Sequence, residues 1–71
     1  MSELIEMAVK VIEVIGESST SWEDAAQNAV KAAAKTVRNI VGIEVVGSTA
    51  AVKNGKITKY KPTTKIAFGV E

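Results

Sequence analysis

Hydrophobic and polar positions near the start of the chain predict a short strand. Residues 8–15 read AVKVIEVI, a run rich in β-branched residues that ends at Gly16. Alternation along a strand divides the apolar residues of this run between both faces, with Val9, Val11 and Ile15 on one and Ile12 and Val14 on the other. A strand that is apolar on both faces is expected to be covered on both sides.

A helix is expected to begin at Ser21, after the polar loop formed by residues 16–20. Asp24 follows Ser21 by three residues, which is typical of a capped helix start, and Thr20 with Glu23 offers the same pattern one residue earlier. Apolar residues then recur at three- and four-residue spacing and form one stripe: Trp22, Ala25, Ala26, Ala29, Val30, Ala33, Val37 and Ile40. The stripe predicts a helix of about twenty residues, roughly 30 Å long. Its many alanines would let it lie close to a sheet.

Two long β-rich runs, residues 41–53 and 56–70, flank Asn54-Gly55 and predict a hairpin. A two-residue turn would give the core side of the sheet the pairs Val45–Thr64, Ile43–Ile66, Thr49–Tyr60 and Val41–Phe68. The other side would carry the pairs Glu44–Lys65, Gly42–Ala67, Ser48–Lys61 and Ala50–Lys59. A bulge would shift this register. Pro62 cannot donate to the ladder, so a bulge or an unpaired edge is expected there.

The size of the chain indicates one domain that needs partners. Seventy-one residues form a marginal core, because so short a chain buries only about 60% of its unfolded surface. There is no Cys, so disulfides cannot compensate, whereas 46% of the residues are hydrophobic. One helix cannot cover strands of the expected length on both faces. Self-association is therefore expected.

Composition also excludes several functional classes. The net charge of +1 and the lack of an aromatic platform argue against nucleic acid as a partner. Without His or Cys the chain lacks the usual general base and thiolate nucleophile, so an enzyme is not expected. No run of 18 apolar residues and no signal-like start are present, so we expect no membrane span and a cytoplasmic location.

Two segments of the sequence resemble the dodecins: VKVIEVIGESSTSWEDAAQNAVKAAAKTVRNIVGIEVV, which begins at Val9, and the C-terminal KIAFGVE. The resemblance starts at Met7, so residues 7–71 are interpreted as a dodecin-like domain. Residues 1–6 are interpreted as an N-terminal extension, the alternative being a short added strand or helical turn. The resemblance implies an α+β fold of βαββ order, with a three-stranded antiparallel sheet wrapped around one helix. It also implies that twelve copies assemble into a hollow homododecamer.

Dodecins typically bind flavins stacked between tryptophans of two-fold-related subunits, and they store these cofactors rather than act as enzymes. On this resemblance the stacking tryptophan falls on Gly42 and a glutamine that reads the ring edge falls on Lys61. Ser48, Glu44 and Lys65 share the expected sheet face and complete the candidate cofactor site. Because Gly42 replaces the tryptophan and Lys61 replaces the glutamine, binding of flavin, whether FMN, FAD or riboflavin, is expected to be weakened.

The lysines of the last strand leave two interpretations open. Lys59, Lys61 and Lys65 share one expected sheet face, so an anionic group such as a phosphate could bind there. Alternatively, these lysines form a solvated face or pair with carboxylates of the protein.

The alternative function is a structural or ion-binding shell of the calcium type that does not bind flavin. Its candidate ligands are four acidic residues: Glu13, Glu17, Glu23 and Asp24. Carboxylates suit hard cations, but no EF-hand spacing is present, and capping and surface roles compete with this interpretation. No residue is therefore assigned to a metal. Trp22 is expected to pack on the sheet rather than on a cofactor.

Overall fold

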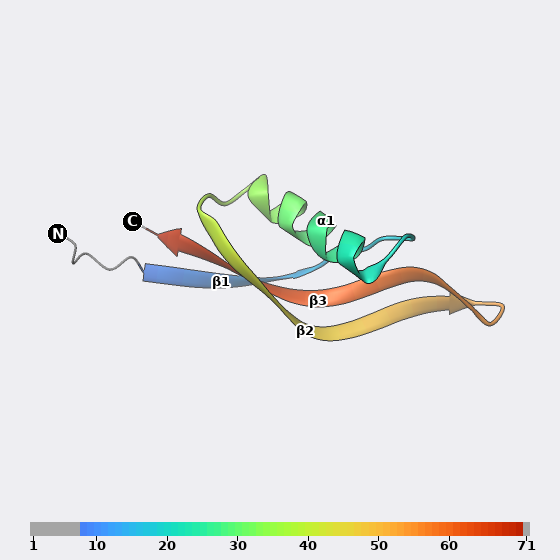
Figure 1. Ribbon diagram of the computed structural model, residues 1–71. Coiled ribbons are helices and arrows are strands. Elements are labelled where there is room, and N and C mark those ends of the chain that lie inside the picture. Colours follow the sequence, from blue (N-terminus) through green and yellow to red (C-terminus); the bar gives the residue numbers. More distant parts are fainter. Residues whose placement is uncertain (1–7, 71) are drawn as a thin grey trace.

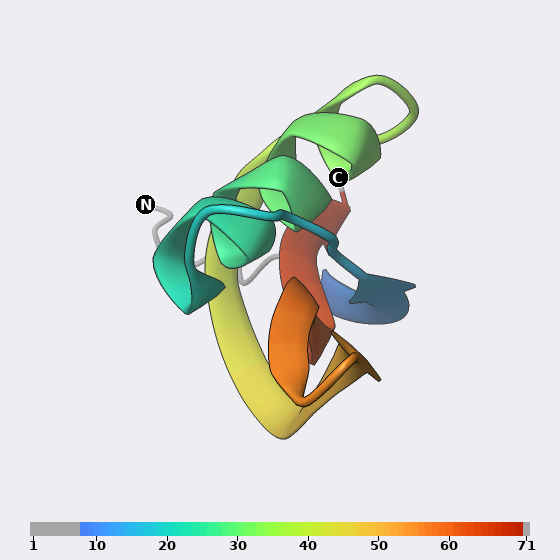
Figure 2. The same ribbon diagram turned by 90° about the vertical axis from the view of Figure 1, so that its right-hand side faces the viewer.

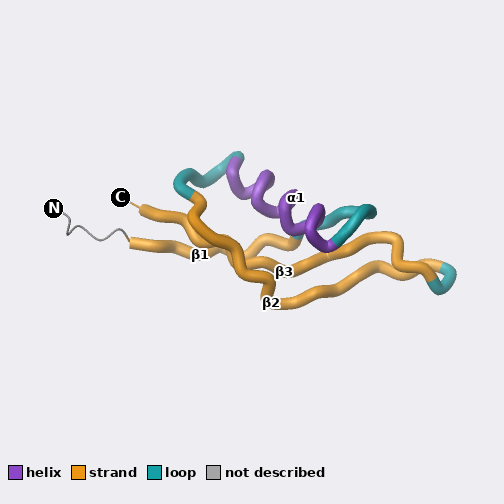
Figure 3. The backbone as a smooth tube through the Cα atoms, in the orientation of Figure 1, coloured by secondary structure: helices purple, strands orange, loops and turns teal. Residues whose placement is uncertain are grey.

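The computed structural model describes residues 8–70, which form a three-stranded antiparallel sheet with one helix on one of its faces (Figure 1). The elements are β1 (Ala8–Ile15), α1 (Trp22–Ala34), β2 (Ile40–Lys53) and β3 (Lys56–Val70). β3 lies in the centre, with β1 and β2 on either side (Figure 3). The predicted βαββ order and antiparallel sheet are confirmed. The predicted N-terminal extension, residues 1–6, lies outside the described residues.

Helix α1 begins as predicted but is shorter than predicted. The Ser21 hydroxyl accepts the backbone N–H of Asp24 at 2.9 Å, which caps the first turn. The helix has 13 residues rather than about twenty, because Thr36 donates its N–H to the carbonyl of Ala33 and Asn39 takes a φ of 61°. A tightened last turn and a left-handed residue end the helix before its apolar stripe ends. No helix within residues 8–70 is long and apolar enough to cross a membrane.

Small residues between α1 and the sheet let the two pack closely. Ala25, Ala29 and Ala33 are buried on the helix, and Ile66 of β3 is 0% exposed beneath them. Gly16 shows how close the backbones are, because a Cβ at this position would overlap the carbonyl oxygen of Ala25. The core is therefore formed by short side chains and by backbone contact.

The register of β2 against β3 is the predicted one near Ile66 and next to the turn, and it is shifted between these two regions and at the start of β2. Four predicted pairs are confirmed: Gly42–Ala67, Ile43–Ile66, Glu44–Lys65 and Val45–Thr64. Register shifts between Ile40 and Gly42 and between Val45 and Gly47 each add one residue to β2, and a third shift between Ala51 and Val52 adds one residue to β3. The other four predicted pairs are therefore wrong, and the observed pairs are Thr49–Lys61, Ser48–Pro62, Ala50–Tyr60 and Ile40–Phe68.

Pro62 lies in the central strand at the point where β1 has ended. The last β1 pair is Ile15–Thr63, and the N–H of Gly16 then donates to the carbonyl of Pro62 at 3.1 Å. In an antiparallel sheet, the N–H and C=O of one residue point toward the same neighbouring strand. The carbonyl of Pro62 points toward Gly16, so the side on which proline lacks an N–H faces the loop after β1. Pro62 is thus not at an unpaired edge, because its carbonyl is hydrogen-bonded there, and the expected bulge lies beside its pair, between Val45 and Gly47.

Thr64 is a buried polar residue whose hydroxyl is satisfied. It is 0% exposed, and its Oγ1 donates to the carbonyl of Val14 at 2.7 Å. We expect Thr64→Val to lower the free energy of unfolding by about 1 kcal/mol, because the substitution removes this bond while keeping the shape. Chemical denaturation measures the change, with Thr64→Ser as a control that keeps the hydroxyl. Unchanged or increased stability in Thr64→Val would contradict the expectation.

The sheet face opposite α1 is covered by no other element of residues 8–70 (Figure 2). We call this surface the open face. Alternation and register assign to it Val9, Val11, Glu13 and Ile15 of β1, Gly42, Glu44, Gly47, Thr49 and Ala51 of β2, and Lys59, Lys61, Thr63, Lys65 and Ala67 of β3.

The protomer is elongated, because the β2–β3 hairpin continues past β1 and α1 (Figure 1). Its radius of gyration is 15.0 Å, whereas a compact domain of this length would have about 11 Å. Beyond the bridge between Ser18 and Tyr60 that follows β1, the sheet is a two-stranded ribbon, on which Val52 and Ile57 are 63% and 52% exposed. A two-stranded ribbon is marginally stable alone, so this part of the chain needs an additional contact.

Candidate functional site

A cavity of about 200 Å³ opens on the open face where the three strands lie side by side. It is lined by Val11, Gly42, Ile43, Glu44, Lys65 and Ala67. Ala67 is paired with Val11 on one side and with Gly42 on the other, so these residues form one row across the sheet. The cavity exists because Gly42 has no side chain, and a Cβ built there would have no neighbour within 4 Å.

The next row across the sheet is charged. Lys65 of β3 is directly opposite Glu13 of β1 and Glu44 of β2. Two carboxylates therefore flank one ammonium, and Glu44 and Lys65 also line the cavity. The rest of the lining is apolar apart from backbone. The arrangement is thus a small apolar depression with one hydrogen-bond acceptor, Glu44, and one donor, Lys65, at its side.

The structure brings together three of the five predicted site residues. Gly42, Glu44 and Lys65 line the cavity, whereas Lys61 lies about 13 Å from Lys65 along β3, at about 3.3 Å per residue. Ser48 does not share the open face, because the extra residue Val46 places it opposite Pro62 on the helix side. The predicted Ser48–Lys61 juxtaposition is therefore wrong.

Sequence reasoning missed three lining residues: Val11, Ile43 and Ala67. Val11 and Ala67 come together through the pairing of β1 with β3, and Ile43 follows Gly42 in β2. Only the β1–β3 register would have indicated that Val11 and Ala67 line the site. Aligning the apolar run of residues 8–15 with the end of β3 would have placed Val11 beside Ala67.

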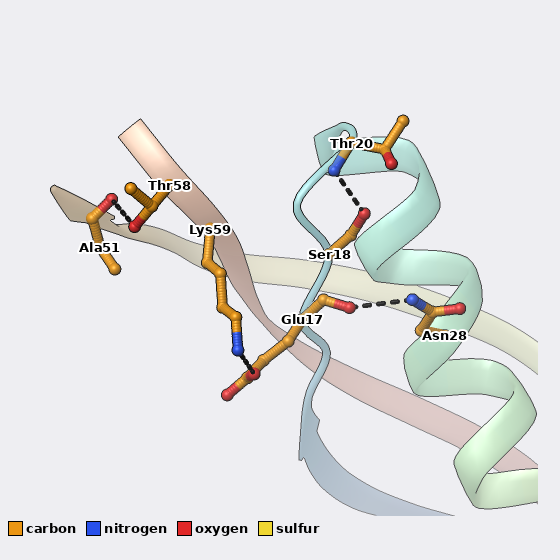
Figure 4. A network of polar contacts seen from close by, with 7 residues as sticks. All are labelled: Glu17, Ser18, Thr20, Asn28, Ala51, Thr58 and Lys59. Carbon is orange, nitrogen blue, oxygen red and sulfur yellow. Dashed lines mark hydrogen bonds and ion pairs between the residues drawn. The ribbon is translucent and has the colours of Figure 1, made fainter. Parts of the chain in front are cut away.

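The lysines of the open face differ in their partners. Lys59 Nζ lies 3.4 Å from Glu17 Oε1, and both side chains are about half exposed (Figure 4). Such an exposed pair contributes little stability, but it does balance the charge of Lys59. Lys61 is opposite Thr49 rather than a carboxylate. These differences decide where an anion could bind on this face.

Near the helix start, Asp24 and Glu17 hold neighbouring segments of the chain together. Asp24 Oδ2 accepts the Ser18 hydroxyl at 2.7 Å. The same hydroxyl accepts the N–H of Thr20 at 2.9 Å (Figure 4). The backbone carbonyl of Glu17 accepts the side-chain amide of Asn28 at 2.9 Å. Within residues 8–70, no three acidic side chains gather as a metal site would require.

Trp22 packs on the sheet, as predicted. Its ring meets Tyr60 of β3 edge to face, with centroids 4.9 Å apart and planes at 66°. The indole is still 39% exposed, on the helix side of the sheet rather than at the cavity.

Three comparisons with known proteins agree on one family. The family model of the dodecins matches residues 8–71. The chain is 43% identical over 60 residues to calcium dodecin from Mycobacterium tuberculosis, which covers 83% of each chain. The crystal structure of that calcium dodecin has a TM-score of 0.77 at 38% identity, over 90% of this chain and 91% of that one.

Two further solved dodecins match the fold more closely. Dodecin from Streptomyces davaonensis has a TM-score of 0.90 at 24% identity, over 94% of this chain and 98% of that one. Dodecin from Streptomyces coelicolor has a TM-score of 0.88 at 28% identity, over 92% and 93%. The chain belongs to the dodecin family.

Proposed function

We propose that this protein is a non-enzymatic small-molecule binding and storage protein that holds flavin or a related planar cofactor in the cavity at Gly42. One observation carries the proposal: the only face of the sheet that the described elements leave uncovered has an apolar depression with few polar groups, as small-ligand sites do. The cavity is open on one side, so a second copy is expected to close it. Assembly as a homododecamer, typical of the family, would supply that copy.

The affinity for flavin is expected to be weak. Stacking of an aromatic side chain on a planar heterocycle contributes about 1–3 kcal/mol per ring, as measured on nucleobases. Gly42 offers no such face, so its loss corresponds to roughly five- to 150-fold weaker binding. A storage role would then require either a high ligand concentration or a ligand that relies less on stacking.

Gly42→Trp is expected to tighten riboflavin binding roughly five- to 150-fold and to quench its fluorescence strongly. The physical reason is that the space over Gly42 is empty, so an indole can lie above the cavity. Fluorescence titration of purified protein measures both effects. Gly42→Ala is the control and should bind as the unmodified chain does. Tight binding with full quenching by the unmodified protein would refute the proposal that Gly42 weakens the site.

A calcium-binding shell without flavin is the second candidate, and the 43% identity to a calcium dodecin favours it. Because no three acidic side chains gather within residues 8–70 of one chain, such a site would need carboxylates from several copies. Isothermal titration of dialysed protein with calcium separates the candidates. Saturable binding at micromolar calcium together with no flavin binding would replace the first function with the second.

A further inference from the structure

We propose that Asn54 is a site of spontaneous modification, at which the backbone nitrogen of Gly55 displaces the side-chain amide and ammonia is lost. The products carry aspartate or isoaspartate in place of Asn54. These two residues form the turn between β2 and β3, at one end of the elongated protomer (Figure 3). Neither of them lines the cavity at Gly42.

The reaction needs water and no oxidant or other reactant. The Gly55 nitrogen loses its proton to solvent and bonds to Asn54 Cγ. The bond from Cγ to Nδ2 breaks, and the leaving nitrogen takes up a proton and departs as ammonia. A cyclic imide remains, which water opens at either carbonyl. Opening at Cγ gives aspartate, whereas opening at the main-chain carbon gives isoaspartate, in which the chain runs through the former side chain.

Both reacting groups are accessible in the folded protein. Asn54 and Gly55 are exposed. Neither the side-chain amide of Asn54 nor the N–H of Gly55 forms a hydrogen bond with another residue of the range 8–70. Gly55 has no side chain, and no atom lies within 4 Å of the position that a Cβ would take. The nitrogen can therefore reach Cγ without displacing a neighbour.

The other two asparagines of the chain lack this combination. Asn28 lies inside α1 and donates its side-chain amide to the carbonyl of Glu17 at 2.9 Å. Asn39 precedes Ile40, whose branched Cβ crowds the backbone nitrogen that would have to attack. Asn54 is therefore expected to react on the order of tenfold faster than either of them.

The end of the ribbon must open for the ring to close, because Asn54 sits in the turn with a φ of 55° and its backbone has to rotate. The ribbon has only two strands there, and a two-stranded ribbon is marginally stable. Val52 and Ile57, beside the turn, are 63% and 52% exposed rather than packed. Local opening of such a poorly packed end costs little free energy.

The two products are expected to differ in their effect on the turn. Each adds a carboxylate, so the eight acidic residues become nine, equal to the nine basic ones, and the net charge falls from +1 to 0. Aspartate tolerates the positive φ of position 54 as asparagine does. Isoaspartate adds a methylene group to the main chain, so the turn can no longer hold Lys53 opposite Lys56. The isoaspartate form is expected to loosen the end of the ribbon.

Incubation of the full-length protein in mildly alkaline buffer tests the site, with peptide mapping by mass spectrometry at each asparagine. We expect conversion at Asn54, with isoaspartate as the main product and an equal amount of ammonia released. Asn54→Gly is the matched control, because Gly-Gly also suits this turn, and it should not acquire the acidic form. Persistence of Asn54, or conversion of Asn28 or Asn39 at the same rate, overturns the proposal.

Hydrogen exchange of the aged forms, separated by ion exchange, then tests the effect on the ribbon. Asn54→Asp is the control, because it carries the added charge without the added methylene group. The isoaspartate form is expected to exchange the amides of Val52 and Ile57 on the order of tenfold faster than this control. Equal exchange would show that the modification changes the charge alone, which would refute the predicted loosening.

Discussion

Gly16→Ala is expected to lower the free energy of unfolding by about 3 kcal/mol or more, and to prevent assembly at low protein concentration. The added methyl would overlap the carbonyl oxygen of Ala25 and would also press on the Ala29 side chain, 3.1 Å away. Overpacking a core costs about 1–3 kcal/mol when side chains can move, and the obstacle here is helix backbone. Helix α1 would have to shift away from the sheet, which would disrupt the alanine contacts.

Gly47→Ala is the matched control for this prediction. The nearest atom to a Cβ at Gly47 is the Thr63 Cβ at 3.9 Å, and Gly47 does not need a positive φ. The substitution also reduces the freedom of the unfolded chain, so it is expected to be neutral or slightly stabilising. Denaturant unfolding of both variants gives the comparison. If Gly16→Ala unfolds like Gly47→Ala, the close approach of loop and helix does not limit stability.

Assembly is the second large effect that we expect. Ten large hydrophobic side chains of the described protomer are exposed, whereas its buried hydrophobic core consists of three alanines and Ile66. Such a chain is not expected to stay folded alone. Sedimentation should therefore show a particle of about 90 kDa, which is twelve copies of the 7.5 kDa chain. The thermal midpoint should rise with protein concentration, because folding and association are coupled.

Ile15→Asp tests which surface holds the assembly together. Ile15 is 61% exposed on the open face of one protomer, so a buried carboxylate there would destabilise contacts between copies. We expect loss of the large particle and of most folded structure. Gln27→Asp introduces the same charge on the exposed side of α1 and is expected to change little. A well-folded monomer or dimer, in either the unmodified protein or Ile15→Asp, would show that protomer stability does not depend on association.

Local features of this protein followed from its sequence because each depends on neighbouring residues. The Ser21 hydroxyl caps the helix through a bond to the N–H three residues later. Asn54 and Gly55 both have positive φ, at 55° and 76°, as the hairpin turn requires. The β-branched runs became strands, and the pairs next to the turn, Val52–Ile57 and Lys53–Lys56, have the register of a two-residue turn. The pairs beside Ile66 keep that register because the extra residue in β3 and the extra residue in β2 cancel.

The candidate site depended on contacts between distant parts of the chain, which local patterns do not encode. The bulge at Val46 moved Ser48 to the helix side, because one extra residue reverses the direction of every later side chain in the strand. Pairing of β1 with β3 brought Val11 and Glu13 beside Ala67 and Lys65, which completed the cavity and its charged row. Helix α1 ended at Ala34 although apolar spacing continued, because the chain had to turn at Asn39 to enter the sheet. Strand pairing over long sequence separations thus decided which side chains the cavity at Gly42 offers a ligand.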